Sequence, residues 1–91
     1  MPKGSKFAET RQFLASNTLY ARQLLRINQE ELAERANLHR TQVSAMERQV
    51  SGASADSIGM LARAIGIPAY VLLMPPTLAH PIILQATQPK T

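Results

Sequence analysis

Hydrophobic and polar residues follow one another along the first part of the chain with the spacing of α-helices. The segment from Phe7 to Leu25 contains neither Gly nor Pro. Residues three, four and seven positions apart share one face of a helix. The segment therefore predicts one long first helix, preceded by a flexible start at residues 1–6. Its apolar positions include Leu14, Ala21, Leu24 and Leu25.

The second helix, predicted over residues 29–36, is marked by signals at both of its ends. Asn28 is a favoured N-cap residue, and Glu31, three positions later, can complete a capping box with it. Asn37 follows the last helical residue, and Asn readily takes the left-handed conformation that ends a helix. We therefore expect the chain to turn at this point.

A third and a fourth helix are predicted further along. Residues 40–48 carry Val43 and Met46 as an apolar pair at helical spacing. After a loop, Ser54 offers an N-cap and Gly66 a C-cap. The residues between these two caps form an apolar stripe of Ile58, Leu61, Ala62 and Ile65.

The remainder of the chain is rich in proline. Pro68 suits the first position of a fifth helix over residues 69–74, which the Pro-Pro pair that follows is expected to end. Residues 75–91 contain four prolines and a single charge. Two interpretations of this tail stay open: a loosely packed segment, or a short strand or arm around residues 82–84 that meets a second subunit.

Length and composition favour one all-α domain. The 91 residues, 45% of them hydrophobic, can build one modest core. Helix-forming residues dominate and aromatic residues make up only 4%, which disfavours strands. No stretch approaches the ~18 apolar residues that a membrane-spanning helix requires. We therefore expect a soluble, cytoplasmic protein with no membrane partner.

Residues for catalysis or metal binding are scarce. The chain has no Cys, which excludes disulfides, thiolate nucleophiles and Cys-ligated zinc. His39 and His80 are the only histidines, and neither has a carboxylate within helical reach. No catalytic triad, Gly-rich phosphate loop or set of ligands at metal-binding spacing occurs. We expect no enzymatic activity, no metal ion and no cofactor.

The charge of the chain suits a polyanionic partner. The formal net charge is +4, and eight of the ten basic residues lie in residues 1–51. The second and third predicted helices lie in the same half and have the spacing of a helix-turn-helix. Ala33 supplies the small residue that a steep crossing requires, and Asn37 supplies the turn. The buried positions expected for this unit are Leu32, Ala33, Ala36, Leu38, Val43 and Met46.

The outer face of the third predicted helix carries short or polar side chains that fit a DNA major groove. At about 100° per residue, this face lies opposite Val43 and Met46. Arg can bond guanine O6 and N7, Gln can pair with adenine, and Thr offers a methyl group to thymine. The alternative is an ordinary solvated helix face. We expect base contacts from Arg40, Thr41, Gln42, Ser44 and Ala45.

Contacts with DNA phosphates are expected around the same two helices. The start of the second helix presents backbone donors and the positive end of the helix dipole, although its residues can also serve as caps alone. A lone His beside a helix start is more often a polar contact than a metal ligand, and Arg48 can also be a plain surface cation. The expected phosphate contacts are Asn28, Gln29, His39, Arg48 and Ser51.

The segments from Asn28 to Leu38 and from Leu38 to Arg48 resemble the helix-turn-helix of the Cro and phage-repressor family, also called xenobiotic-response-element-like. The resemblance implies a five-helix, lambda-repressor-like DNA-binding domain over residues 7–74, with a short C-terminal extension. Residues 37–48 are particularly similar to restriction-modification controller proteins.

The resemblance also implies roles for individual residues. Arg22 and Glu47 match an Arg and a Glu that pair in this family between the first helix and the end of the recognition helix. The pair would hold the recognition helix in its orientation. Two positions depart from the family pattern, since Arg26 and Gln49 stand where the family usually has Gly.

The pattern and the resemblance together indicate a transcriptional regulator that binds double-stranded DNA, as a homodimer on an inverted repeat. The alternative is an antitoxin or adaptor whose tail at residues 75–91 binds a protein partner. The earlier helices use their apolar stripes for the core, so a dimer interface would lie late in the chain. The residues expected there are Tyr70, Leu73, Met74, Ile82, Ile83 and Leu84.

Overall fold

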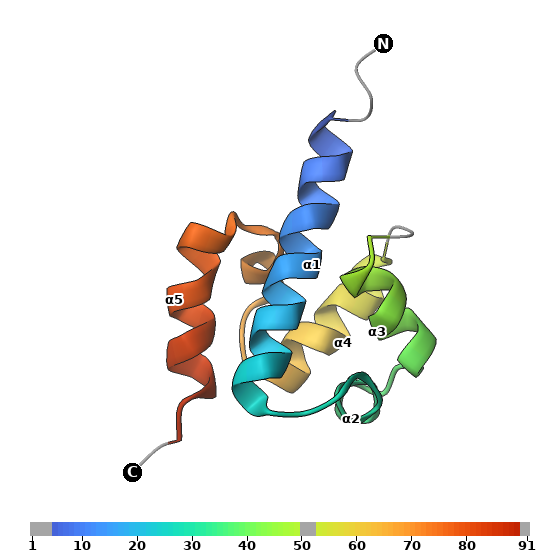
Figure 1. The fold of residues 1–91 in the computed structure, drawn as a ribbon, viewed down its shortest axis with the longest axis vertical. Helices are drawn as coiled ribbons and strands as arrows, with labels where there is room; N and C mark the ends of the chain where they lie inside the picture. Colours follow the sequence, from blue (N-terminus) through green and yellow to red (C-terminus); the bar gives the residue numbers. More distant parts are fainter. Residues whose placement is uncertain (1–4, 50–52, 90–91) are drawn as a thin grey trace.

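The computed structural model describes residues 5–49 and 53–89, and this part of the chain is entirely helical, without a strand. The all-α class predicted from the sequence is confirmed (Figure 1). Five α-helices and one short 3-10 helix follow one another: α1 Ser5–Leu25, α2 Gln29–Ala36, α3 Arg40–Glu47, α4 Ala55–Ile65, η1 Ala69–Leu73 and α5 Pro76–Thr87.

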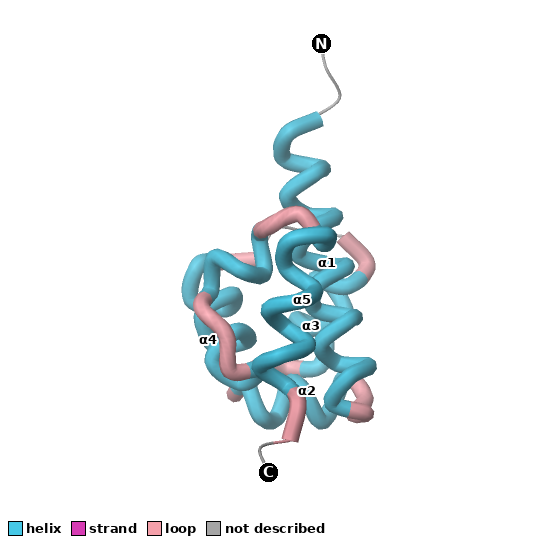
Figure 2. Tube along the Cα trace, turned by 90° about the vertical axis from the view of Figure 1, so that its left-hand side faces the viewer, coloured by secondary structure: helices cyan, strands magenta, loops and turns pink. Residues whose placement is uncertain are grey.

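The long helix α1 organises the fold. Helices α3 and α5 lie on opposite sides of it, and α2 lies at its foot beside α3 and α4 (Figure 1). The first turns of α1 extend beyond the other helices both in the ribbon and in the tube view (Figures 1 and 2). The core lies where α1, α4 and the C-terminal elements meet the helix-turn-helix. Its largest fully buried apolar side chains are Leu32, Val43, Leu61, Val71, Leu72 and Ile83.

Both ends of α2 have the caps that the sequence predicts. The Asn28 side chain accepts the N–H of Glu31 at 2.8 Å, and the Glu31 carboxylate accepts the N–H of Asn28 at 2.9 Å. Asn37 is left-handed, with φ of 59°. The Leu38 N–H returns to the carbonyl of Ala33 at 2.8 Å. The local sequence therefore fixes both ends of α2 and the direction in which α3 leaves the turn.

Arg26 and Gln49 take a conformation that suits Gly better. Their φ angles are 58° and 60°, in the left-handed region that side chains with a Cβ disfavour. These are the two positions at which the sequence departs from the Gly of the family pattern. The backbone has the geometry that Gly would allow, and each larger residue occupies it at a cost of about 1–2 kcal/mol.

The fifth helix predicted over residues 69–74 is wrong in type, because Ala69–Leu73 forms a 3-10 helix. Prolines stand before and after this segment, which leaves too few residues for a stable α-helix. Buried Asn17 on α1 holds it in place. The Asn17 side-chain amide donates to the carbonyl oxygens of Leu72 at 3.0 Å and Met74 at 2.9 Å.

The structure corrects the conformation predicted for the proline-rich tail. Residues 76–87 form α5, which is neither a loose segment nor a strand. Pro76 is tolerated because the first turn of a helix does not use its N–H groups, whereas Pro81 removes one hydrogen bond inside the helix. Packing of Ala79 and Ile83, both 0% exposed, holds the helix in place despite that loss.

Candidate nucleic-acid interface

Helix α3 is fixed to α1 by the ion pair that the family resemblance implies. The Arg22 guanidinium donates from Nε to Glu47 Oε2 at 2.8 Å and from Nη2 to Glu47 Oε1 at 3.0 Å. The Glu47 side chain is 6% exposed and that of Arg22 19%. The hydrogen bond to Glu47 raises the pKa of Arg22 above its ordinary value, so the guanidinium stays charged.

A third and a fourth contact extend this pair to the start of α2. Arg22 Nη1 donates to the carbonyl of Ile27 at 3.1 Å. Gln29 Nε2 donates to Glu47 Oε1 at 2.9 Å. We call Arg22, Ile27, Gln29 and Glu47 the Glu47 cluster. It joins α1, the loop before α2, α2 itself and the end of α3, and so sets the angle at which α3 is presented.

The Glu47 cluster changes the role predicted for Gln29. Gln29 was expected to contact a phosphate at the start of the helix, where backbone donors point outward, but its side-chain amide donates to Glu47. The backbone at the start of α2 remains the group that can face a phosphate there. Asn28 beside it is exposed, and its capping box uses the side-chain oxygen and the backbone N–H. Its side-chain nitrogen Nδ2 therefore stays available for an anion.

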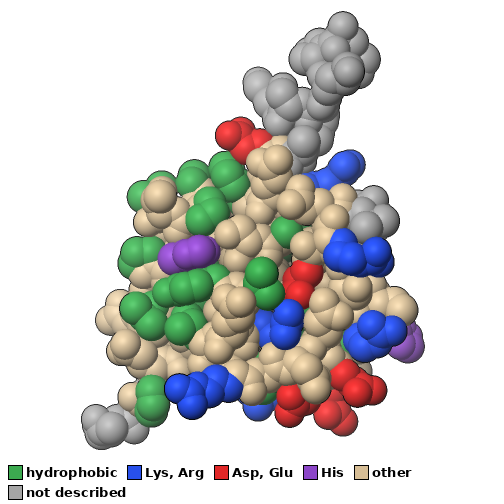
Figure 3. All heavy atoms as spheres, in the orientation of Figure 1, with side chains coloured by type: hydrophobic (Ala, Val, Ile, Leu, Met, Phe, Trp, Pro, Cys, Tyr) green, Lys and Arg blue, Asp and Glu red, His purple; other side chains and the backbone are tan. Residues whose placement is uncertain are grey.

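The outer face of α3 is open, as the sequence predicts. Arg40 and Thr41 are exposed, and Ser44 and Ala45 are half-buried. Exposed Arg48 donates from Nε to the Ser44 hydroxyl at 3.2 Å, so its guanidinium lies against the helix. Basic side chains gather on this side of the molecule in the space-filling view (Figure 3). The opposite face of α3 is sealed, because Val43 and Met46 are buried.

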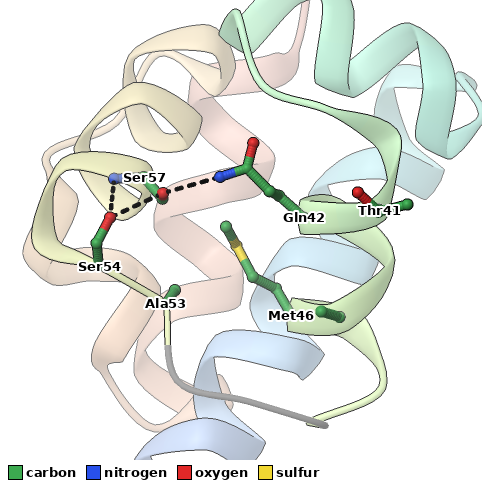
Figure 4. Close-up of a pocket in the computed structure, with 7 residues that line it drawn as sticks. Thr41, Gln42, Met46, Ala53, Ser54 and Ser57 are labelled. Carbon is green, nitrogen blue, oxygen red and sulfur yellow. Dashed lines mark hydrogen bonds between the residues drawn. The ribbon is translucent and has the colours of Figure 1, made fainter.

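Gln42 does not lie free on that outer face. Its side-chain oxygen accepts the N–H of His39 at 2.9 Å, and its amide nitrogen reaches the hydroxyl of Ser57 at 3.5 Å (Figure 4). Ser57 also accepts a hydrogen bond from Ser54 at 2.8 Å. A bidentate contact with adenine requires both ends of the Gln amide. Because both ends are used within the chain, the predicted adenine contact is not available in this arrangement.

A half-open hollow of about 330 Å³ separates α3 from the start of α4 (Figure 4). Thr41 lies at its edge, Met46 enters it from α3, and the bonded Gln42 amide lies along one wall. The Ser54–Ser57 pair closes the α4 side. The hollow adjoins the outer face of α3, so the serine-rich start of α4 borders the same surface.

The remaining predicted phosphate contacts are placed as follows. His39 is exposed at the N-cap position of α3 and contributes its backbone N–H to the contact with Gln42. Ser51 lies outside the described residues.

Among the residues predicted for the dimer interface, Tyr70 is 68% exposed, whereas Ile83 is fully buried within the chain and has no surface to offer a second subunit.

The roles of Gln29 and Gln42 were missed from the sequence, although a signal for one of them was present. Gln42 stands three residues after the N-cap residue His39, where a Gln or Glu commonly reaches back to the cap backbone. Gln29 has no such local signal, because its partner Glu47 is 18 residues away.

No described group of His, Asp and Glu could hold a metal ion, and no described helix is long and apolar enough to span a membrane.

Comparisons with known proteins agree with this geometry. A family model described as helix-turn-helix matches residues 19–72. A protein of Neisseria meningitidis serogroup B, described as a Neisseria hypothetical transcription factor, is 44% identical over 61 residues. That match covers 63% of this chain and 58% of the relative, so the chain spans less than two thirds of the relative's length.

A solved structure is similar as well. The crystal structure of a hypothetical transcription factor from Neisseria superposes with a TM-score of 0.73 at 38% sequence identity, over 80% of this chain and 84% of that one. The family match extends from the middle of α1 to η1 and so includes α2, α3 and the Arg22–Glu47 pair. The chain therefore belongs to the helix-turn-helix family, of the Cro and phage-repressor type.

Proposed function

We propose that this chain is a transcriptional regulator that recognises specific sequences in double-stranded DNA by inserting α3 into the major groove. One observation carries the proposal. The buried side of α3 is fixed by the Glu47 cluster, while its outer side is open and carries short side chains between Arg40 and Arg48. A helix that is held in one orientation with a narrow, polar outer face is what base readout requires.

The proposed contacts follow from what each side chain has free. Arg40 has its guanidinium for guanine, and Thr41 its hydroxyl and methyl group, whereas Ser44 and Ala45 allow a close approach. Gln42 acts as a positioning residue in the free protein. Contacts with the DNA phosphates, which set the position of the protein on the duplex, come from Asn28, the backbone of Gln29, His39, Arg48 and Ser51.

We further propose that the protein acts as a homodimer on an inverted repeat and that it binds DNA without a cofactor. One short helix reads only a few base pairs, and a single module buries too little surface for tight, selective binding. Two helices on successive major grooves would double the contact. The resemblance of residues 37–48 to restriction-modification controller proteins supports a role in transcriptional regulation.

A binding selection from random duplex DNA tests the proposal. We expect this selection to enrich a two-fold symmetric site. The protein is then titrated on the selected site and on a scrambled site at a fixed salt concentration. Arg40→Ala should lose about 1–3 kcal/mol on the selected site and little on the scrambled one. Arg63→Ala, which removes another exposed arginine, from α4, is the matched control and should leave selectivity unchanged. Failure to enrich any site would refute sequence-specific binding.

The alternative function, an antitoxin or adaptor, is favoured by one observation on the C-terminal part. Helix α5 has exposed apolar side chains, Leu78 at 57% above all, that a protein partner could cover. Deleting residues 75–91 would not separate the two functions cleanly, because α5 contributes Ala79 and Ile83 to the core. Surface substitutions on α5 that leave Ala79 and Ile83 in place, such as Leu78→Glu, are therefore the better test.

A further inference from the structure

Two contacts show which way each side of α1 faces. Arg22 pairs with Glu47 at the end of α3, with Nε and Oε2 2.8 Å apart, so the Arg22 side of α1 faces α3. Tyr20 stacks on His80 of α5, with ring centroids 3.8 Å apart, so the Tyr20 side faces α5. Both sides of α1 can be followed from these two contacts toward the start of the helix.

Two charged residues near the start of α1 fall on these two sides. Residues eleven positions apart in a helix point the same way to within about 20° and are separated by roughly 16 Å along the helix axis. Arg11 stands eleven residues before Arg22, and Glu9 stands eleven residues before Tyr20. Arg11 therefore lies on the α3 side of α1, and Glu9 lies on the α5 side.

The α3 side of α1 is covered as far as Ala15 and open beyond it. Thr18 and Ala15 lie within about 40° of Arg22 around the helix, and they are 0% and 5% exposed. Arg11, one turn further toward the start, is exposed, as are all of residues 9–12. Among the residues that the structure describes, no carboxylate pairs with the Arg11 guanidinium.

This exposed start of α1 lies outside the shared helix-turn-helix module. The family match begins at residue 19, whereas α1 begins at Ser5. The first turns of α1 extend past the other helices (Figures 1 and 2). The charge of Arg11 therefore contributes neither to the core nor to the part of the chain that the family model describes.

The start of α1 continues the basic surface of α3. Figure 3 shows Lys and Arg side chains along one edge of the molecule, from beside the first turns of α1 down over α3, and an acidic side chain on the opposite side of the start of α1. Phosphates of one DNA strand follow each other every 3.4 Å along the duplex axis. The roughly 16 Å between Arg11 and Arg22 therefore spans about five phosphates at most.

We infer that the exposed start of α1 is a further DNA-binding element, in which Arg11 contacts a backbone phosphate beyond the base pairs that α3 reads. The inference rests on the proposed function and extends it, because the contact lies outside α2 and α3. The Arg22–Glu47 pair holds α1 and α3 together, so the position of Arg11 relative to α3 is fixed. A phosphate contact of this kind adds affinity without reading sequence.

The salt dependence of binding measures this contact. Each phosphate that a protein neutralises adds about 0.9 to the slope of log affinity against log salt concentration. Arg11→Ala should lower the slope by about 0.9 for each bound chain, so the affinity advantage of the parent should shrink roughly 3.5-fold per chain between 50 and 200 mM salt. The ratio of affinities for the selected and the scrambled site should stay unchanged. Arg63→Ala removes the same charge from an exposed position on α4 and should keep the parent's slope.

Two further measurements separate a phosphate contact from a structural role. Arg11→Lys keeps the charge and should keep the slope, because a phosphate accepts hydrogen bonds from either cation. Ethylation interference identifies the phosphates whose modification blocks binding. In each half-site the parent should show one such phosphate that Arg11→Ala no longer shows, and the circular dichroism of the two proteins should be the same. Equal slopes and equal interference patterns for Arg11→Ala and Arg63→Ala would overturn the inference.

Titrations on unselected duplex DNA distinguish this inference from the proposed function. A phosphate contact does not depend on sequence, so the difference in slope should persist on any duplex. Binding without selectivity, but with a lower slope for Arg11→Ala, refutes the proposed function and supports the inference. Selective binding with no change in slope for Arg11→Ala refutes the inference alone, and no binding to any duplex refutes both.

Discussion

Removing one partner of the Glu47 cluster should destabilise the domain strongly. In Glu47→Ala, the Arg22 guanidinium loses two hydrogen bonds and its counter-charge in a setting where its side chain is only 19% exposed. Gln29 loses its acceptor at the same time. Removing one side of a buried pair costs about 3–5 kcal/mol, because the other charge stays behind without a partner.

The size of this loss matters because the domain is small. A chain of this length is expected to have a total stability of roughly 5–13 kcal/mol, so a loss of about 3–5 kcal/mol removes roughly a quarter of it or more. Urea unfolding followed by circular dichroism measures the change. Glu34→Ala removes an exposed glutamate from α2 and serves as the control, with an expected change within about 0.5 kcal/mol.

A double variant separates the cost of a stranded charge from the value of the pair. Replacing Arg22 by Met and Glu47 by Leu leaves no unpaired charge, so the double variant should be more stable than either single replacement. The double variant should still lose DNA affinity, because nothing then fixes the angle of α3. If Glu47→Ala unfolds at the same urea concentration as Glu34→Ala, the buried-pair reasoning is refuted.

Three further outcomes are expected. Arg26→Gly and Gln49→Gly should each raise the melting temperature modestly, since relief of about 1–2 kcal/mol of left-handed strain exceeds the ~0.5–1 kcal/mol entropy cost of Gly, and a lower melting temperature for both would contradict the strain. His80 stacks on Tyr20 with ring centroids 3.8 Å apart, and burial lowers its pKa, so the unfolded chain binds the extra proton and stability should fall as the pH drops below about 6.5; His80→Phe should flatten that part of the pH profile of urea midpoints. Asn17→Ala removes the donor to the η1 carbonyls and should cost about 1–3 kcal/mol by the same measurement, and a midpoint equal to the parent's would show that the buried amide is replaceable.

The helix-turn-helix was predictable because its signals are local. Capping by Asn28 and Glu31 and the left-handed turn at Asn37 each depend on residues within one or two turns. The small Ala33 at the crossing is visible in the sequence for the same reason, and it is 2% exposed in the structure. Local signals of this kind do not depend on any distant contact, so the sequence is sufficient to read them.

The C-terminal part was not predictable in the same way. Its prolines argue against a helix locally, and the apolar run at residues 82–84 suggests a strand. The outcome depends instead on Ala79 and Ile83 packing against α1, about sixty residues earlier in the chain. Burial of those side chains outweighs the hydrogen bond lost at Pro81, and no property of residues 75–91 alone shows that balance.

The sequence by itself determined the class of the fold, the bounds of α2 and the residues that face outward from α3, since these follow from helical periodicity and caps. Tertiary structure decided which of those outward side chains are free. Gln29 and Gln42 lie on the expected faces, but their amides bond to Glu47 and Ser57, 18 and 15 residues away. A hydrogen bond depends on a separation of about 3 Å, and only the packing of α1, α3 and α4 brings these partners so close.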